Sequence, residues 1–248
     1  MKKFALIVVL VAVVGAFPAH AVTYGTLDGK THPYVGLVRL FDGAGNAWRC
    51  SGTLLSSTVV LTAGHCTKGA TSARVWFDAA IPDLGSGGTA GTPYTHPQFT
   101  TVSFTAPDIG VVVLSKPVKM SKYGALPTAG LVATIGSGST LHTVVGYGLQ
   151  EVKPNYTSQL ARYRGTVKIQ GVGGQLGDYV QISSNSTALW SGGTCAGDSG
   201  GPLFRGNTNV VLAITSGGAN VNCKGASYDY RVDVAAARTF LSAFLKVP

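Results

Sequence analysis

The sequence predicts an all-β protein that ends in a single α-helix. Segments rich in Val, Ile, Thr and Leu recur along the chain, and Gly, Ser, Asn and Pro separate them at short intervals. Many short strands with regular turn signals are typical of a β-barrel or a β-sandwich. The composition agrees: 12% of the 248 residues are charged, 45% are hydrophobic and 34 are glycine. Such a chain suits a compact, turn-rich β protein and not a disordered one.

The expected strands are 34–41, 51–62, 73–77, 109–114, 143–145, 166–170, 180–183 and 210–215. A segment from about 119 to 140 is rich in Gly, Pro, Ala and Ser, and it would join two halves of the molecule. The helix is expected over 232–245, because its apolar residues fall on one face of a 3.6-residue repeat. These residues are Val234, Ala237, Phe240, Leu241 and Phe244.

The N-terminal segment 1–21 has the pattern of a secretory signal peptide. It contains two lysines, an apolar run from Phe4 to Phe17 and the sequence Ala19-His20-Ala21, which predicts cleavage after Ala21. The apolar run is shorter than the roughly 20 residues that a membrane-spanning helix needs. We therefore expect a secreted chain of residues 22–248 without stable membrane insertion.

The charge pattern argues against a nucleic-acid partner. The formal net charge is +9, and removal of Lys2 and Lys3 with the signal peptide lowers it by two. The other basic residues are scattered singly, whereas nucleic-acid binding needs them concentrated on one surface.

Four cysteines in an exported protein predict two disulfides, for which three pairings exist. We favour pairing within each neighbourhood, Cys50 with Cys66 and Cys195 with Cys223, because this closes the shorter loops. A zinc site is the alternative, but neither a C-x-x-C spacing nor clustered histidines support it. No metal or organic cofactor is expected.

Three short motifs carry candidate chemistry. A serine hydroxyl is a poor nucleophile at neutral pH, so it needs a base and a third group that orients the base. LTAGHC places His65 just after an apolar strand, and PDIGVVVL places Asp108 at the entrance to another. A carboxylate there is costly unless hydrogen-bond donors match its oxygens. TCAGDSGGP places Ser199 among small residues that let another group approach the backbone.

Together these motifs resemble the chymotrypsin-like (trypsin-fold) serine endopeptidases over nearly the whole mature chain. The order His, Asp, Ser is that of the family. Flanking segments also match: His32-Pro33-Tyr34-Val35, Cys50-Ser51-Gly52-Thr53-Leu54, Gly146-Tyr147-Gly148 and Ser216-Gly217-Gly218. The resemblance implies two six-stranded antiparallel β-barrels, at about 34–128 and 136–232, before the C-terminal helix.

The resemblance also implies a role for each site residue. Ser199 would attack the peptide carbonyl, His65 would act as general base and then general acid, and Asp108 would orient the imidazole. The backbone N–H groups of Gly197 and Ser199 would form the oxyanion hole. The Ser216 hydroxyl would help to satisfy Asp108.

Side-chain preference follows from the pocket that the family uses for the residue preceding the cut. Gly193 stands where an aspartate would select Arg or Lys, so trypsin-like cleavage is disfavoured. Thr215 replaces the histidine of glutamate-specific relatives, which argues against acidic side chains. The pocket would also include Gly217, Gly218 and Ser227. An uncharged pocket favours apolar or aromatic side chains, at roughly 25 cal/mol per Å² buried.

Family members that are activated by cleavage pair a new N-terminal Ile or Val with the aspartate matched here by Asp198. Cleavage after Ala21 would free Val22 for this ion pair. The leading interpretation is therefore a secreted, monomeric serine endopeptidase acting on protein or peptide substrates, with a protein inhibitor as a further partner. A non-catalytic binding protein on the same fold is the alternative. An esterase, which would share the acyl-enzyme chemistry, is the less favoured interpretation.

Overall fold

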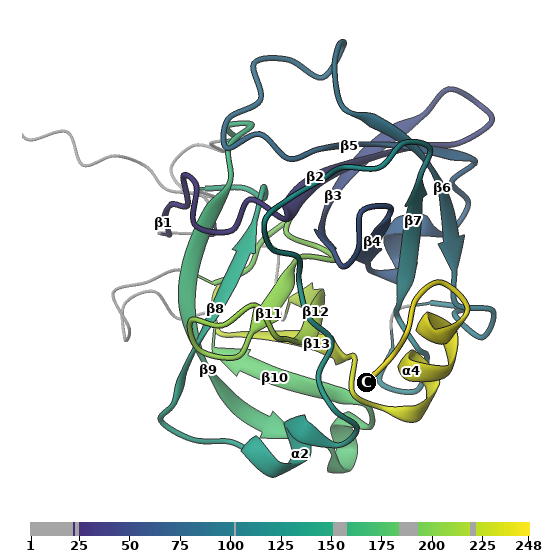
Figure 1. Cartoon of the computed structure of the whole chain (residues 1–248). Helices are drawn as coiled ribbons and strands as arrows, with labels where there is room; N and C mark the ends of the chain where they lie inside the picture. The colour runs from purple at the N-terminus through teal and green to yellow at the C-terminus, as the bar shows by residue number, and fades with distance from the viewer. Residues whose placement is uncertain (1–21, 23–24, 102, 151–157, 184–192, 219–221) are drawn as a thin grey trace, which may run out of the picture.

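The computed structural model describes residues 22, 25–101, 103–150, 158–183, 193–218 and 222–248. The predicted signal peptide lies outside these residues. Two antiparallel β-barrels, one from each half of the chain, lie side by side (Figure 1). This arrangement confirms the all-β prediction and the pair of six-stranded barrels.

The first barrel closes in the strand order β2-β3-β4-β7-β6-β5. Its strands are β2 (Val35–Phe41), β3 (Ala47–Leu54), β4 (Val59–Thr62), β5 (Ser72–Trp76), β6 (Thr89–Thr95) and β7 (Gly110–Leu114). The side chains of Val38, Val60 and Val112, which the strand register places on one face, fill its interior with no exposed surface. Inward-facing apolar residues alternate with outward-facing ones, as the pleat of a strand requires.

Two features of this barrel differ from the sequence prediction. The single strand expected over 51–62 is a hairpin, because the chain turns between Leu54 and Val59 and the Ser56 hydroxyl accepts a hydrogen bond from the Val59 N–H. Strand β6 was not predicted, since Gly91 and Pro93 interrupt its pattern. Gly91 is required there: a Cβ at this position would lie 2.5 Å from Val112 Cγ1.

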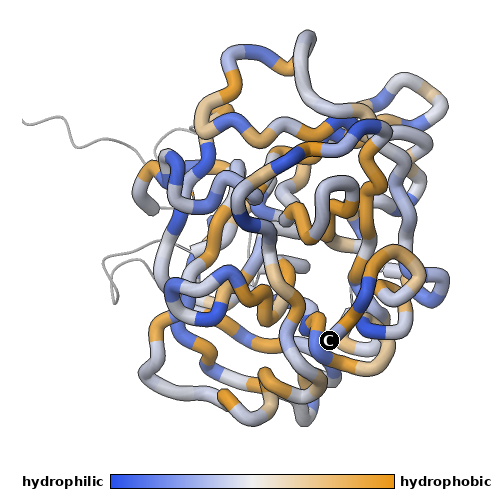
Figure 2. Tube along the Cα trace, in the orientation of Figure 1, coloured by the Kyte–Doolittle hydropathy of each residue, from blue (hydrophilic) through white to orange (hydrophobic). Residues whose placement is uncertain are grey.

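The second barrel closes in the order β8-β9-β10-β13-β12-β11, and the short strand β1 (Thr26–Leu27) pairs with β9 outside the ring. Its strands are β8 (Leu141–Gly146), β9 (Tyr163–Val172), β10 (Tyr179–Ser183), β11 (Pro202–Phe204), β12 (Val211–Gly218) and β13 (Ala226–Arg231). A 3₁₀ turn, η1 (Gly174–Leu176), joins β9 to β10. Orange apolar positions recur along the strands of both barrels in Figure 2.

Short helices occupy the connections. Helix α1 (Gly64–Thr67) follows β4, and α2 (Leu131–Ile135) lies in the segment that joins the barrels. Helix α4 (Ala235–Ser242) is shorter than the predicted 232–245. It begins later because the Val232 N–H still bonds to Leu212 O, and it ends earlier because the Phe244 N–H bonds only three residues back, to Leu241 O.

Helix α4 belongs to the second half of the sequence but packs on the first barrel, beside β6 and β7 (Figure 1). The Phe244 ring lies 5.2 Å from that of Tyr94, and the Phe240 ring lies 5.3 Å from that of His96. The C-terminal helix therefore holds the two barrels together.

Arg162 provides a second connection between the barrels. It is 1% exposed and lies just before β9. Its guanidinium donates to the carbonyl oxygens of Val35 and Phe77 in the first half and, through Nε, to Asp28 Oδ2 at 2.9 Å. Fixing the barrels in this way fixes the relative positions of residues contributed by each.

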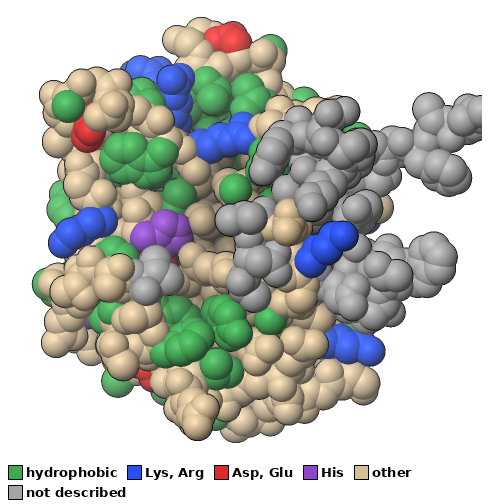
Figure 3. All heavy atoms as spheres, turned by 180° about the vertical axis from the view of Figure 1, so that it is seen from behind, with side chains coloured by type: hydrophobic (Ala, Val, Ile, Leu, Met, Phe, Trp, Pro, Cys, Tyr) green, Lys and Arg blue, Asp and Glu red, His purple; other side chains and the backbone are tan. Residues whose placement is uncertain are grey.

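Both predicted disulfides are present, Cys50–Cys66 and Cys195–Cys223. Among the described helices, none is long and apolar enough to cross a membrane. Lys and Arg side chains stand apart from one another on the face shown in Figure 3, in agreement with the scattered charge of the sequence.

Candidate active site

His65 and Asp108 are joined by two hydrogen bonds. The backbone N–H of His65 donates to Asp108 Oδ1 at 2.7 Å, and imidazole Nδ1 lies 2.8 Å from Asp108 Oδ2. The Asp108 side chain has no exposed surface, whereas that of His65 is 24% exposed. A carboxylate fixed beneath a partly exposed imidazole sets the orientation of the ring and favours a proton on Nδ1.

The sequence around His65 explains this close approach. Helix α1 carries His65 against the start of β7, and Gly64 faces Asp108. A Cβ at Gly64 would lie 3.0 Å from the Ile109 nitrogen and 3.1 Å from Asp108 Oδ1. The glycine before the histidine therefore lets the helix reach the carboxylate.

Ser216, on β12, comes to Asp108 from the second barrel. Its hydroxyl donates to Asp108 Oδ2, and its side chain is buried. All three donors to the Asp108 carboxylate are thus in place, which offsets the cost of burying it. The structure brings His65, Asp108 and Ser216 together across the junction of the barrels.

The loop that carries Ser199 is held by backbone bonds to both barrels. The Ser51 N–H in β3 donates to Ser199 O at 2.8 Å, and the Gly200 N–H donates to Thr215 O in β12 at 2.8 Å. A Cβ at Gly200 would lie 2.7 Å from the Ala63 nitrogen. Ser199 is therefore packed beside the segment that leads into His65, and its side chain is partly exposed.

Within the described part of the chain, no hydrogen bond joins Ser199 to the imidazole. The Nε2 atom of His65 contacts Cys66 Sγ at 3.6 Å. Hydrogen bonds between catalytic groups are often long or poorly aligned without substrate and tighten when it binds. The geometry brings the predicted nucleophile and base to the same place but leaves their bond unmade.

Two backbone N–H groups of the serine loop stand out among the described residues. Those of Asp198, Gly200 and Gly201 donate to carbonyl oxygens, whereas those of Gly197 and Ser199 donate to no protein acceptor. Both residues are partly exposed. Gly197 has φ of +95°, and a Cβ there would lie 3.0 Å from the Gly148 Cα, so only glycine fits without strain.

Asp198 lies behind this loop and is fully buried. Its Oδ1 accepts from the Gly148 N–H at 2.8 Å, and its Oδ2 accepts from the Cys195 N–H at 2.9 Å. Burial raises the pKa of this carboxyl to about 7, although both hydrogen bonds and the charge of Arg49 oppose the shift.

Val22 is buried in the core of the second barrel, among Val132, Val144 and Leu203. In the full-length chain its nitrogen belongs to the peptide bond with Ala21, so it carries no ammonium charge. The predicted ion pair with Asp198 can form only after cleavage of that bond.

The residues predicted for the specificity pocket lie on two paired strands and the serine loop. Gly217 and Gly218 on β12 pair with Tyr228 and Ser227 on β13. The Ser227 hydroxyl lies 2.8 Å from Thr194 Oγ1, next to Gly193, and donates to Gly217 O at 3.1 Å. The structure therefore brings Gly193, Gly217, Gly218 and Ser227 to one place beside Ser199.

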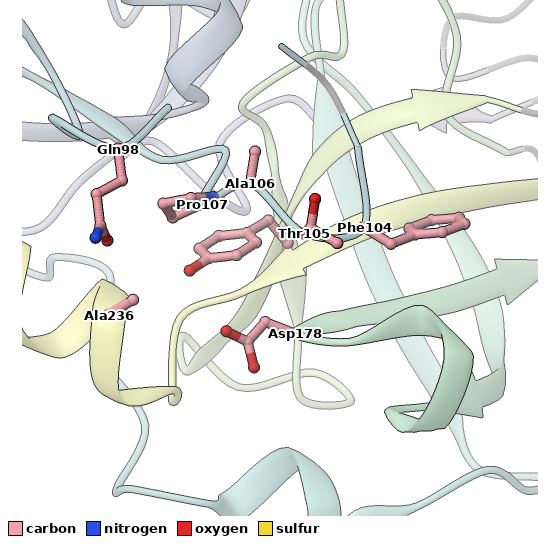
Figure 4. A pocket seen from close by; sticks show the side chains of 8 residues that line it. Gln98, Phe104, Thr105, Ala106, Pro107, Asp178 and Ala236 are labelled. Atoms are coloured by element: carbon pink, nitrogen blue, oxygen red, sulfur yellow. The ribbon is translucent and has the colours of Figure 1, made fainter. Parts of the chain in front are cut away.

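A separate pocket of about 190 Å³ lies behind Asp108 (Figure 4). Ala106 and Pro107, which directly precede Asp108, line one side, and Asp178 and Gln98 come from the others. None of the predicted site residues lines it.

One group of possible metal ligands, Cys50, His65 and Cys66, lies in the described part of the chain. Because the two cysteines form a disulfide, neither offers a thiolate to a metal. This cluster is better explained as the disulfide that holds the turn presenting His65.

The fold and this arrangement of side chains define a two-barrel serine endopeptidase. The chain belongs to the trypsin family, whose model, described as Trypsin, matches residues 27–241. It is 30% identical over 231 residues to Serine protease 1 of Drosophila melanogaster, covering 82% of this chain and 77% of that protein. It is 29% identical over 182 residues to Chymotrypsin of Phaedon cochleariae, covering 70% and 64%.

A solved structure of HL collagenase shares the fold, with a TM-score of 0.75 over 90% of this chain and 99% of that chain, at 17% identity. Taken with the family match, this identifies the chain as a serine endopeptidase of the trypsin family.

Proposed function

We propose that this protein is a secreted endopeptidase that hydrolyses peptide bonds through an acyl-enzyme on Ser199. The observation that carries the proposal is the hydrogen-bonded set His65–Asp108–Ser216, which lies beside the loop of Ser199. Ser199 Oγ attacks the peptide carbonyl carbon while His65 Nε2 takes its proton. The imidazolium then gives this proton to the leaving amine as the C–N bond breaks. Water then attacks the acyl-enzyme carbonyl, His65 repeats the two proton transfers, and Ser199 is freed as the ester bond breaks.

The oxyanion formed in each addition is held by the N–H groups of Gly197 and Ser199. Their availability in the described structure supports this role. Loss of one such donor costs about 3 kcal/mol of transition-state stabilisation. The Asp108 carboxylate, which three donors hold in place, orients the imidazole and stabilises the imidazolium.

The enzyme is proposed to cut peptide bonds that follow apolar or aromatic residues. None of the pocket residues Gly193, Gly217, Gly218 and Ser227 carries a charge, and Gly218 leaves the pocket entrance open. Burial of a large apolar side chain there is worth roughly 1.5–3 kcal/mol.

Export and activation are proposed to be one event. Cleavage after Ala21 removes the signal peptide and frees the Val22 amine, whose ammonium group would pair with Asp198. The buried carboxyl has hydrogen-bond donors but no cation in direct contact among the described residues, so a new positive charge would stabilise its ionised form. The mature enzyme is proposed to act as a monomer.

A comparison with Ser199→Ala tests the proposal. Secreted protein is incubated with a fluorophosphonate probe and with casein, and its N-terminus is sequenced. We expect labelling and proteolysis by the wild type, neither by the variant, and an N-terminus at Val22. Labelling that survives in Ser199→Ala would refute the assigned nucleophile. A folded wild type that neither labels nor cleaves would indicate a non-catalytic binding protein.

A further inference from the structure

Asp229, on β13, is a buried carboxylate that the mechanism does not use. It has no exposed surface, and its Oδ1 lies 3.4 Å from the Ser227 hydroxyl. Among the described residues, its Oδ2 has no hydrogen-bond partner. An unpaired buried carboxyl oxygen costs free energy, so its presence requires an explanation.

The other fully buried aspartates of the described structure show what a purely structural role would look like. Both oxygens of each are paired: Asp28 with His32 and Arg162, Asp108 with His65 and Ser216, Asp198 with Gly148 and Cys195, and Asp233 with Arg231 and Val132. Asp229 departs from this rule. Its free oxygen is therefore not a general property of aspartates in this fold.

The strand register places Asp229 at the specificity pocket. Ser227 and Asp229 are two residues apart on β13, so their side chains leave the same face of the strand. The Ser227 hydroxyl contacts Thr194 and Gly217, and Asp229 Oδ1 lies 3.4 Å from it. The carboxyl therefore lies next to Ser227 on the same face, two residues further along β13.

A second unpaired polar atom faces Asp229. Thr215, on β12, is its direct cross-strand partner, and paired residues on antiparallel strands carry their Cβ atoms about 5 Å apart on one face. The Thr215 hydroxyl is buried and, like Asp229 Oδ2, has no hydrogen-bond partner among the described residues. Two opposed residues thus offer two acceptors to a donor that the described part of the chain does not supply.

The electrostatic setting favours a cation as that donor. Burial raises the pKa of the Asp229 carboxyl to about 7, and the nearby Asp198 carboxylate raises it further. Each cause disfavours a negative charge on Asp229 while the pocket is empty. An entering cation removes this penalty because it pairs with the ionised form.

We propose that Asp229 is a specificity-determining residue, which, with Thr215, accepts the charged end of a lysine or arginine side chain at the base of the pocket. The proposal rests on the proposed function and extends it to a second class of substrate beside the apolar one. The glycine at 193 leaves the usual acidic position empty, and the carboxylate is supplied instead from β13. Gly193 and Gly218 bring no side chain to the pocket.

The test uses peptide substrates that differ only in the residue before the cut: Phe, Leu, Arg, Lys and the neutral Gln. The measured quantity is the ratio of kcat/KM for Arg or Lys to that for Phe, in the wild type, in Asp229→Asn and in the control Asp178→Asn, which changes an exposed carboxylate. We expect the ratio to fall on the order of 100-fold in Asp229→Asn and to stay unchanged in Asp178→Asn. Fluorophosphonate labelling shows whether each variant keeps an intact site.

The outcomes separate the two proposals. A wild type that cleaves after Phe or Leu but no faster after Arg or Lys than after Gln overturns the role of Asp229 and leaves the proposed function standing. A wild type that cleaves none of the peptides overturns the proposed function. An Asp229→Asn variant that still labels but loses kcat/KM equally for both substrate classes also overturns the role of Asp229, since the residue would then act only on structure.

A measurement on the wild type alone covers the case in which Asp229→Asn does not fold. Cleavage of the Phe peptide is inhibited with benzamidine, a flat cation, and with benzamide, its neutral counterpart. We expect benzamidine to bind at least 10-fold more tightly. Equal inhibition by the two compounds would contradict a carboxylate acceptor in the pocket.

Discussion

The backbone N–H of Ser51 donates a hydrogen bond of 2.8 Å to the carbonyl oxygen of Ser199. Ser51 lies on β3 of the first barrel, directly after Cys50, whose disulfide reaches Cys66 beside His65. The Ser51 hydroxyl donates to Gly197 O and accepts from the Tyr147 N–H, each at 2.9 Å. One residue of the first barrel thus holds the loop of the second barrel that carries the proposed nucleophile and oxyanion donors.

Ser51→Ala is therefore expected to lower kcat by about 10-fold with little change in KM. Removal of the hydroxyl leaves Gly197 O and the Tyr147 N–H without this partner, which costs about 1–3 kcal/mol of stability. Ser51 acts as a positioning residue, so the rate of fluorophosphonate labelling should fall along with kcat. Ser57→Ala, in the β3–β4 turn, is the control. Unchanged labelling in Ser51→Ala would show that its hydroxyl serves stability alone.

Gly200 and Gly206 form a matched pair for the packing of the serine loop. Both have positive φ, +76° and +52°, so alanine is strained at either position. At Gly206 a Cβ meets nothing closer than Leu141 O at 3.9 Å, whereas at Gly200 it would lie 2.1 Å from Thr62 Oγ1 and 2.6 Å from Ser51 O.

We expect Gly206→Ala to lower the free energy of unfolding by about 1 kcal/mol and to keep full activity. Gly200→Ala should lower it by at least about 2 kcal/mol more and should abolish labelling of Ser199. Urea unfolding in a Ser199→Ala background measures the stabilities without self-digestion. Equal losses in the two variants would mean that the tight packing around Gly200 does not hold the loop.

Asp108→Asn tests the two bonds between Asp108 and His65. An amide retains the shape of the carboxyl, but it cannot accept from Nδ1 with the charge that favours the required imidazole tautomer. We expect kcat to fall about 10⁴-fold, with KM nearly unchanged. Asp178→Asn, an exposed substitution, is the control. A loss of less than about 10-fold would contradict the role of Asp108 in orienting the base.

Most of the fold and the three candidate motifs could be read from the sequence because their signals are local. LTAGHC, PDIGVVVL and TCAGDSGGP each lie within a few residues, and the short-loop rule selected the observed disulfides. Strand β6 was not predicted because Gly91 and Pro93 break its pattern. Strand β13 was not predicted because ASYDYR alternates polar and aromatic residues without an aliphatic run.

Asp229 could not be recognised from the sequence for a different reason. An aspartate between two tyrosines is an ordinary strand residue until the register sets it opposite Thr215. Its unpaired oxygen depends on which side chains the fold fails to bring near it. The same holds for Ser51, whose bonds join segments that lie 96 and 146 residues away in the chain.

Asp198 makes the stability of the uncleaved chain depend on pH. Its pKa is about 7 in the folded chain, above its ordinary value of 3.8. A carboxyl whose pKa rises on folding contributes stability that is fully present below pH 3.8 and is lost as the pH rises through 7. The free energy of unfolding of the full-length Ser199→Ala protein, minus that of its Asp198→Asn derivative, should therefore fall between pH 4 and pH 8.

The chain that begins at Val22 should behave in the opposite way. Its free ammonium group would pair with Asp198 and favour the ionised carboxylate, so the folded pKa of this carboxyl would fall. The same stability difference should then hold or grow as the pH rises from 4 to 7, since a lowered pKa contributes stability that is lost only on acidification. Urea unfolding of both chain lengths at pH 4.5, 6 and 7.5 measures the two slopes. Identical slopes would show that the Val22 amine does not reach Asp198, and activation would then require another charge partner for this carboxylate.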